Sequence, residues 1–466
     1  MAVFPCIGRG TRRHGRVVRI GLILESTQTS TASAPAAVHS FAEVAAPARR
    51  QIAFGPGLVH LLGTVGPNDL IFNSLVAANY GYSLLWALIP AYTLHFFIAE
   101  ASSRYVLTTG ESIVEGLARL GRPVMIVLAG AVVFRRHLNN LFPVPLMGQS
   151  LDMLIPLPFR YSALVWSLVS TTAAFALMAS GGYAGVERRA KGLVVLLMAS
   201  FVMVAVMARP APGAIVAGLF APTWPGPEAV VLLMALAASS VGSINHLKYP
   251  AFVFEKGWRD LSVQRKQRVD LALSCLGQLS VAALIQIAVA AALQGGGAQI
   301  KTVQDLSRIF STHLGEPGRI VFAIAMWATV FSTYVGSNTG YSLIVADVYE
   351  RFLRTSSRAA GESRDKIRQR AYVLFLTFFC VSPLYVLFTS WEPFWIGILA
   401  GAIFFALAPL LMTGVLVISS NRAVMREQAS GWWSKAMIGL AIALSLALTY
   451  RSLTDLALRL LAHRAS

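Results

Sequence analysis

Two short polar runs interrupt apolar stretches of the chain, and they hold the residue types best suited to binding a ligand. The first run, Gly66-Pro67-Asn68-Asp69, lies within the apolar stretch 56–76, and the second, 239–248, lies within 229–254. Gly and Pro disfavour a continuous helix, and carbonyl groups freed by such a break can bind a cation. The candidate ligands are Asp69, Asn68 and Gly66 in the first run and Gly242, Asn245 and His246 in the second.

Each candidate has a structural alternative. Asp69 is the predicted metal ligand, because a carboxylate in the middle of a membrane is costly unless it faces a partner or a cavity. Lys248 offers that partner: an ion pair with Asp69 would neutralise the carboxylate in the manner of a tethered ion. His246 could ligate through a neutral imidazole or could pack by hydrogen bonding. The two Asn side chains could ligate or cap helix ends, and the two Gly residues would contribute carbonyl oxygens.

The composition places these runs in a membrane protein. Only 13% of the 466 residues are charged and 56% are hydrophobic, whereas ordinary soluble domains carry about 25% charged residues. Disordered chains are charge-rich, so they are excluded. The three cysteines show no paired spacing, which excludes a disulfide scaffold. No phosphate-binding loop, zinc-protease motif or nucleophile elbow is present, so we expect neither an enzyme nor a bound cofactor.

Hydropathy predicts an all-α membrane domain over 54–460, preceded by a disordered basic tail over 1–53. The tail lacks the apolar core of a secretion signal. Cytoplasmic placement of the N-terminus puts 28 Lys and Arg on the cytoplasmic side and 8 on the other, which predicts an outside C-terminus in the cell membrane. The net charge of +18 then reflects the Lys and Arg that orient the chain, and contact with anionic lipid headgroups explains the basic loop 351–370 without nucleic acid. The eleven predicted spans are 56–76, 84–103, 123–147, 162–180, 192–208, 229–254, 271–293, 320–343, 371–389, 393–418 and 433–450.

The first and sixth spans, which carry the polar runs, are five apart. They would therefore begin the two halves of a five-plus-five inverted repeat of the leucine-transporter type, with both helices broken at the ligand site. The third span is unusual because Arg135 and Arg136 lie in its middle. Inserting one Arg at that depth costs about 2.5–3.5 kcal/mol on insertion scales. Either it faces a wet interior or its boundary is wrong. The polar run 332–339 in the eighth span could line a pathway or hold helices together.

Several helix-end motifs resemble those of the natural resistance-associated macrophage protein (Nramp) family of divalent metal transporters. The likeness covers roughly 50–460 and rests on Gly55-Pro56-Gly57, Gly81-Tyr82, Leu84-Leu85-Trp86, Glu255-Lys256-Gly257-Trp258 and Asn421-Arg422. The resemblance implies Mn²⁺ or Fe²⁺ binding by an Asp-Pro-Gly-Asn motif in span one and a Met-Pro-His motif in span six, usually with proton symport.

The chain departs from both motifs. Gly66 replaces the leading Asp, and Asp69 stands at the trailing Asn position. Gly242 lies nearest the Met position, so the soft thioether is missing. The remaining oxygen and nitrogen ligands suit Mg²⁺ or Mn²⁺. The third span also lacks a mid-helix carboxylate, so the sequence gives no support for proton coupling.

The leading functional hypothesis is secondary transport of Mg²⁺ or Mn²⁺ by alternating access. A second hypothesis keeps the fold and changes the cargo to an amino acid or other small organic solute, with Lys248 replacing the driving ion. A third is a non-transporting sensor or scaffold built on a degenerate transporter, for which Arg135 and Arg136 in the cation path are the main argument. The expected partners are the inorganic cation and the bilayer. The sequence does not indicate which oligomeric state the protein adopts.

Overall fold

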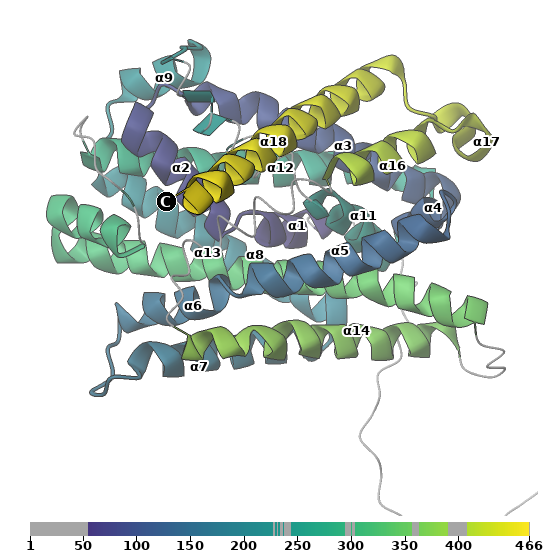
Figure 1. Cartoon of the computed structure of the whole chain (residues 1–466), viewed down its shortest axis with the longest axis horizontal. Coiled ribbons are helices and arrows are strands. Elements are labelled where there is room, and N and C mark those ends of the chain that lie inside the picture. Colours follow the sequence, from purple (N-terminus) through teal and green to yellow (C-terminus); the bar gives the residue numbers. More distant parts are fainter. Residues whose placement is uncertain are drawn as a thin grey trace, which may run out of the picture. The chain divides into compact units, whose positions relative to one another are not determined.

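The computed structural model describes residues 55–226, 229–230, 232–233, 236, 244–293, 300, 303–356, 363–389 and 408–465. Every regular element among them is a helix, as predicted (Figure 1). The polar residues 239–243, Gly242 included, lie outside the described residues. So do the predicted tail and most of the tenth predicted span.

The first predicted half of the repeat holds the following helices. They are α1 (Pro56–Thr64), α2 (Pro67–Tyr80), the 3₁₀ helix η1 (Leu85–Ala87), α3 (Leu88–Thr109), α4 (Ile113–Ala118), α5 (Arg122–Asn140), α6 (Pro143–Asp152), α7 (Ser162–Ala179), α8 (Gly182–Met207) and α9 (Pro212–Phe220).

The remaining helices belong to the second predicted half and the C-terminal part. They are η2 (Ile244–Leu247), α11 (Lys248–Glu255), η3 (Leu261–Val263), α12 (Gln264–Leu293), α13 (Val303–Ser356), α14 (Arg364–Val381), η4 (Ser382–Phe388), α16 (Ala408–Ser420), α17 (Arg422–Met425), η5 (Arg426–Gln428) and α18 (Trp432–Ala465).

Five described helical segments are long and apolar enough to cross a membrane, or six if one bent pair is a single span. Helices that are broken or carry charge, among them α1–α2, α3 and α5–α6, are not in this group. The count of eleven spans therefore stays a prediction. The five segments are Ser162–Ala179, Gly182–Met207, Leu261–Leu293, Asp305–Phe352 and Arg364–Phe388, and the bent pair is Ala408–Ser420 with Arg422–Gln428.

The first span is broken where the sequence predicted it. Helix α1 ends at Thr64, Val65 and Gly66 are extended, and α2 begins at Pro67. Proline fits the first position of a helix because that position needs no N–H donor. In the sixth span, the described residues from 244 on form the short 3₁₀ turn η2 and continue as α11.

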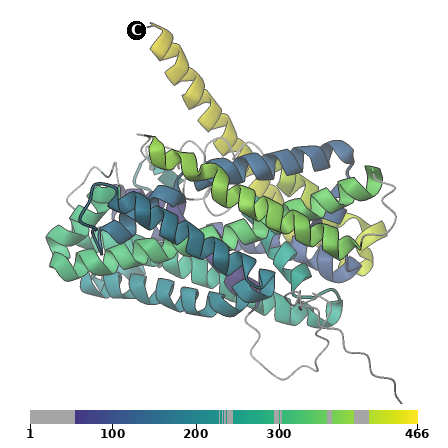
Figure 2. The ribbon, with the colours of Figure 1, turned by 90° about the horizontal axis from the view of Figure 1, so that it is seen from below.

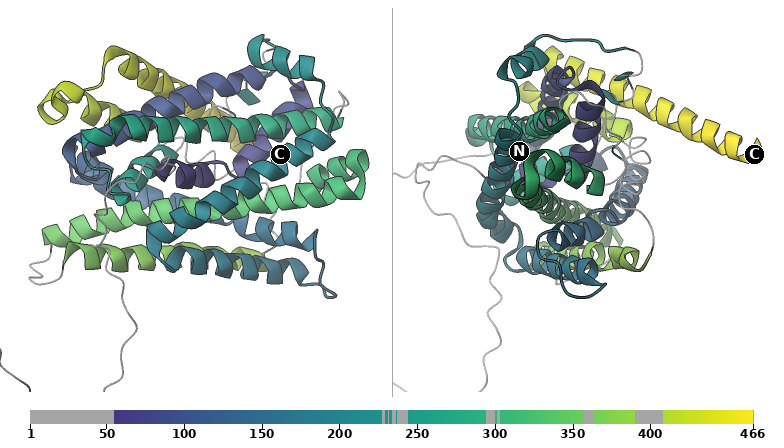
Figure 3. Two further views of the ribbon diagram at one scale, coloured as in Figure 1. Left: turned by 180° about the vertical axis from the view of Figure 1, so that it is seen from behind. Right: turned by 90° about the vertical axis from the view of Figure 1, so that its left-hand side faces the viewer.

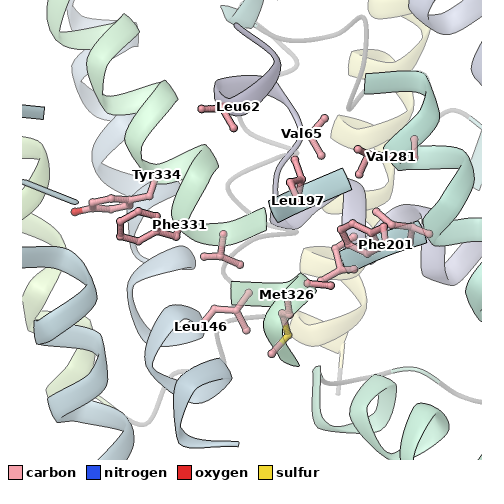
Figure 4. Packing of buried hydrophobic residues seen from close by; sticks show 14 of the residues in the cluster. Leu62, Val65, Leu146, Leu197, Phe201, Val281, Met326, Phe331 and Tyr334 are labelled. Carbon is pink, nitrogen blue, oxygen red and sulfur yellow. The ribbon is translucent and has the colours of Figure 1, made fainter. Parts of the chain in front are cut away.

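Helices α12 and α13 pack against the two halves of the first broken span, α1 and α2. α12 packs against α1, α2 and α3, and α13 packs against α1, α6, α8 and α14 (Figures 2 and 3). α1 and α13 meet at two glycines: a Cβ built on Gly336 would lie 2.5 Å from the backbone nitrogen of Gly63. Only glycines permit such an approach. Leu62 and Val65 then join the apolar core formed with α6, α8, α12 and α13 (Figure 4).

Candidate functional site

The break in the first span leaves the carbonyl group of Gly63 without its helical partner. In a continuous helix this oxygen would accept from the nitrogen of residue 67, and Pro67 has no N–H. Two side chains replace that donor. The Lys248 ammonium of α11 and the Ser337 hydroxyl of α13 both donate to the Gly63 oxygen, the latter at 2.6 Å. Lys248 Nζ also donates to Ser337 Oγ at 2.9 Å.

A second carbonyl group at the break is bonded in the same way. Thr333, one turn before Ser337 on α13, donates from its hydroxyl to the oxygen of Val65. The polar run of the eighth predicted span therefore donates hydrogen bonds directly to the unwound backbone. Its hydroxyls satisfy buried acceptors that would otherwise be costly inside a membrane.

Asp69 lies in the first turn of α2 and is 5% exposed. Its Oδ2 accepts from the backbone N–H of Gly66 at 2.8 Å, so the carboxylate covers the amino end of α2. This position favours negative charge, because the helix dipole is positive there. A carboxylate has about four lone-pair sites, so it can accept more than one hydrogen bond or ligate a cation.

The side chains next to Asp69 are amides. Asn73 donates to the backbone oxygen of Asp69 at 2.7 Å, and Gln286 of α12 donates to Asn73 Oδ1 at 2.8 Å. Asn68 is half-buried beside them. The structure thus brings Gly66, Asn68 and Asp69 together at the start of α2.

The candidates of the sixth span lie in two further settings. Asn245 Oδ1 accepts from the Tyr341 hydroxyl at 2.8 Å. His246 is buried, with its ring centroid 4.6 Å from that of His95 on α3. Among the described ion pairs, none joins Lys248 to Asp69.

A histidine of the first span completes a cluster that the sequence analysis missed. His60 Nε2 lies 2.9 Å from His95 Nε2, and all three histidine rings are buried. The available signal was an imidazole inside an apolar span, six residues before Gly66. Within the described part of the chain, no three His, Cys, Asp or Glu side chains form a group able to hold a metal ion.

Arg136 lies inside the protein, 1% exposed, on the face of α5 that packs against α13. Its Nε donates to Asn338 Oδ1 at 2.5 Å, and its Nη2 donates to Asn140 Oδ1. Asn140 donates in turn to Asn338 Oδ1 at 3.0 Å and to the Phe379 carbonyl oxygen at 2.8 Å. The guanidinium of Arg136 is therefore held by amides in the protein interior.

The amino end of α1 is fixed by Asp270 of α12. Its carboxylate accepts from the N–H groups of Gly55 and Gly57, at 3.0 and 2.7 Å, and from the Tyr249 hydroxyl at 3.0 Å. These bonds satisfy N–H groups that a helix start leaves open. Asp270 and Lys248 together hold α1 at both of its ends.

The chain matches the family model described as "Natural resistance-associated macrophage protein-like" over residues 57–455. It is 23% identical over 416 residues to the divalent metal cation transporter MntH of Pectobacterium carotovorum, covering 86% of this chain and 93% of that protein. It is 25% identical over 307 residues to the MntH of Deinococcus radiodurans, covering 63% and 68%.

Two solved structures share the fold. The manganese transporter of Eremococcus coleocola, in complex with an aromatic bis-isothiourea substituted compound, superposes with a TM-score of 0.69 at 14% identity, over 88% of this chain and 89% of that one. MhsT in complex with L-phenylalanine gives a TM-score of 0.58 at 17% identity, over 85% and 98%. The same fold thus occurs in a manganese transporter and in a protein with a bound amino acid.

Proposed function

The chain belongs to the natural resistance-associated macrophage protein (Nramp) family of transporters, which are not enzymes, and we propose that it moves a divalent metal cation across the cell membrane. The curated relatives that it matches carry the name of divalent metal cation transporters. In this proposal the chain crosses the bilayer eleven times, with a cytoplasmic N-terminus and an outside C-terminus, and works by alternating access.

The buried carboxylate of Asp69 is the observation that carries the proposal. It lies at the break, and its charge is favoured by the amino end of α2. Asp69 would be the anionic ligand of the cation. Asn68 and the carbonyl oxygen of Gly66 lie beside it, and Gly242, Asn245 and His246 are the proposed ligands from the sixth span. Such oxygen and nitrogen ligands suit Mg²⁺ or Mn²⁺.

The position of Asp69 also argues against an amino acid as cargo. In transporters of this architecture, a half-helix amino end typically binds the carboxylate of an anionic substrate. Here the chain's own carboxylate covers the amino end of α2. An incoming carboxylate would meet like charge at this place.

Lys248 limits where the cargo can bind. Its ammonium is bonded to the Gly63 oxygen, so a second cation at that oxygen would meet like charge. The cation therefore binds on the Asp69 side of the break. Proton coupling is not part of this proposal, and Lys248 as a substitute for the driving ion belongs to the organic-solute hypothesis.

Uptake of radioactive Mn²⁺ into proteoliposomes tests the proposal, with excess Mg²⁺ as competitor. Asp69→Asn keeps an acceptor oxygen for the Gly66 N–H and removes the charge, so it should fold and lose Mn²⁺ uptake. Asp69→Ala should lose uptake as well. Asp365→Ala, at an exposed carboxylate of α14, is the matched control and should transport normally.

Three outcomes would contradict the proposal. Unchanged Mn²⁺ uptake by folded Asp69→Asn would remove Asp69 from the site. Saturable flux of a labelled amino acid without Mn²⁺ flux would favour the organic-solute hypothesis. Absence of saturable flux for both substrates in the folded wild type would favour a sensor or scaffold.

A further inference from the structure

Three cationic side chains surround one aromatic ring in the interior. The ring of Tyr341 on α13 has Lys248 Nζ at 5.3 Å, Arg136 Cζ at 5.9 Å and Arg135 Cζ at 6.0 Å from its centroid. Lys248 is 0% and Arg136 is 1% exposed. Cation–π contact offsets part of the desolvation, but an aromatic face carries no net charge. The cluster therefore concentrates positive charge beside the break.

The hydrogen-bond partners of the two fully buried cations are neutral. Arg136 is bonded to Asn338 and Asn140, and Lys248 to Gly63 and Ser337. Within the described chain, neither cation takes part in an ion pair with a carboxylate.

The two acidic residues of α13 that follow Tyr341 pair with arginines of α14. Asp347 of α13 pairs with Arg368 of α14, and Glu350 pairs with Arg364, also of α14. These pairs lie beyond Tyr341, toward the carboxyl end of α13. They give the cluster no counter-charge through direct contact.

One buried donor at the cluster, Arg136 Nη1, has no hydrogen-bond partner. The amide of Asn338 lies beside it and beside the Tyr334 hydroxyl. The orientation of the Asn338 amide is fixed by its partners, because its Oδ1 accepts from both Arg136 and Asn140. Buried donors are normally satisfied, so an unused guanidinium donor beside further buried cations indicates an acceptor that carries negative charge.

We propose that Arg136 and Asn338, with Lys248 nearby, form a binding site for a small inorganic anion of the chloride class. Arg136 Nη1 and Asn338 Nδ2 supply the hydrogen bonds, and the cluster around Tyr341 supplies the charge. The anion balances buried positive charge while the cation is carried past Asp69. This site is independent of which cation the protein transports.

A halide suits the site better than an organic acid. Asn338 and Asn140 are 0% exposed and lie between α5, α13 and α14. Chloride is of the order of size of one buried water, so it is the kind of anion that needs the least rearrangement of such packing. A carboxylate would need space for its substituent as well.

Equilibrium binding of radioactive chloride to the purified full-length protein in detergent tests the site without transport. The wild type should bind chloride saturably. Asn338→Asp is nearly isosteric and places a tethered carboxylate against Arg136, so it should fold and lower chloride affinity by roughly tenfold or more. Arg136→Gln should lower it as well.

Asn79→Asp is the matched control, because it adds the same charge at an exposed position of α2 and should bind chloride as the wild type does. Thermal unfolding checks that each variant is folded. No saturable chloride binding by the wild type, or unchanged binding by folded Asn338→Asp, would overturn the proposal. Failure of Mn²⁺ transport with chloride binding intact would contradict the proposed function alone.

Discussion

The side chain of Lys248 donates a hydrogen bond to the carbonyl oxygen of Gly63, which lies 185 residues earlier in the chain. The break in the first span leaves this backbone oxygen without a helical donor, and a charged side chain of the protein supplies one. The bond also ties the start of α11 to the end of α1. Both halves of the predicted repeat thus contribute to the same point in the membrane.

Lys248→Met tests how much this hydrogen bond contributes to stability. The change removes the charged donor and leaves Ser337 as the hydroxyl donor to Gly63, at a cost of about 1.5–3 kcal/mol. We expect a lower thermal unfolding temperature that sodium or potassium salts raise more than choline salts, because a free cation can replace the ammonium.

Lys256→Met is the control, since Lys256 forms a partly exposed ion pair with Glu187. It should show the same small response to all three salts. An equal response of Lys248→Met to sodium and choline would refute the idea that its ammonium occupies a cation position.

Gly336→Ala should destabilise the protein strongly. The new Cβ would lie 2.5 Å from the backbone nitrogen of Gly63, so α1 and α13 must separate. Overpacking of this kind costs about 1–3 kcal/mol. Gly192→Ala on α8 has open space around its Cβ and should be neutral or stabilising by about 0.5–1 kcal/mol. Unfolding in detergent distinguishes the two, and equal stabilities would contradict the close crossing of α1 and α13.

Asp270→Ala should loosen the amino end of α1. It removes the acceptor of two backbone N–H groups and of the Tyr249 hydroxyl, all in a buried setting. Each buried donor left unsatisfied costs about 1–3 kcal/mol. The unfolding temperature should fall clearly, whereas Asp365→Ala should change stability by no more than about 0.5 kcal/mol. Equal unfolding temperatures for Asp270→Ala and Asp365→Ala would argue against the role of Asp270 in anchoring α1.

The proposed membrane orientation can be tested with single cysteines. Arg160→Cys and Ser262→Cys lie at exposed positions before α7 and before α12. Starting from a variant without native cysteines, a membrane-impermeant maleimide should label Arg160→Cys in intact cells and Ser262→Cys only after permeabilisation. The reverse pattern would invert the orientation.

The break in the first span was predictable because its cause is local. Gly66 and Pro67 disrupt the helix through their own backbone properties, without help from distant residues. The donors that satisfy the freed carbonyl groups were not predictable. Ser337 and Thr333 reach the freed carbonyl groups only because Gly63 and Gly336 let α1 and α13 approach closely. A hydropathy pattern does not show which helices are in contact.

The buried charges show the same limit. The sequence marked Arg136 as costly, but two amides held by α5 and α13 decide how it is accommodated. For Asp69, the residue type and position suggested a ligand, while its bond to the Gly66 N–H depends on where α2 begins. His60 was missed because its partner His95 comes from a different span.

The proline at the start of α2 has a consequence for motion. On the α1 side the backbone bonding ends with Val65 N–H donating to Leu61, and on the α2 side it begins with Leu70 N–H donating to Gly66. Pro67 cannot add a bond across this gap. α1 can therefore pivot against α2 while both segments keep their internal backbone bonding, and resistance to the pivot comes from side chains and packing. A hinge of this kind can move without losing any backbone hydrogen bond within α1 or α2.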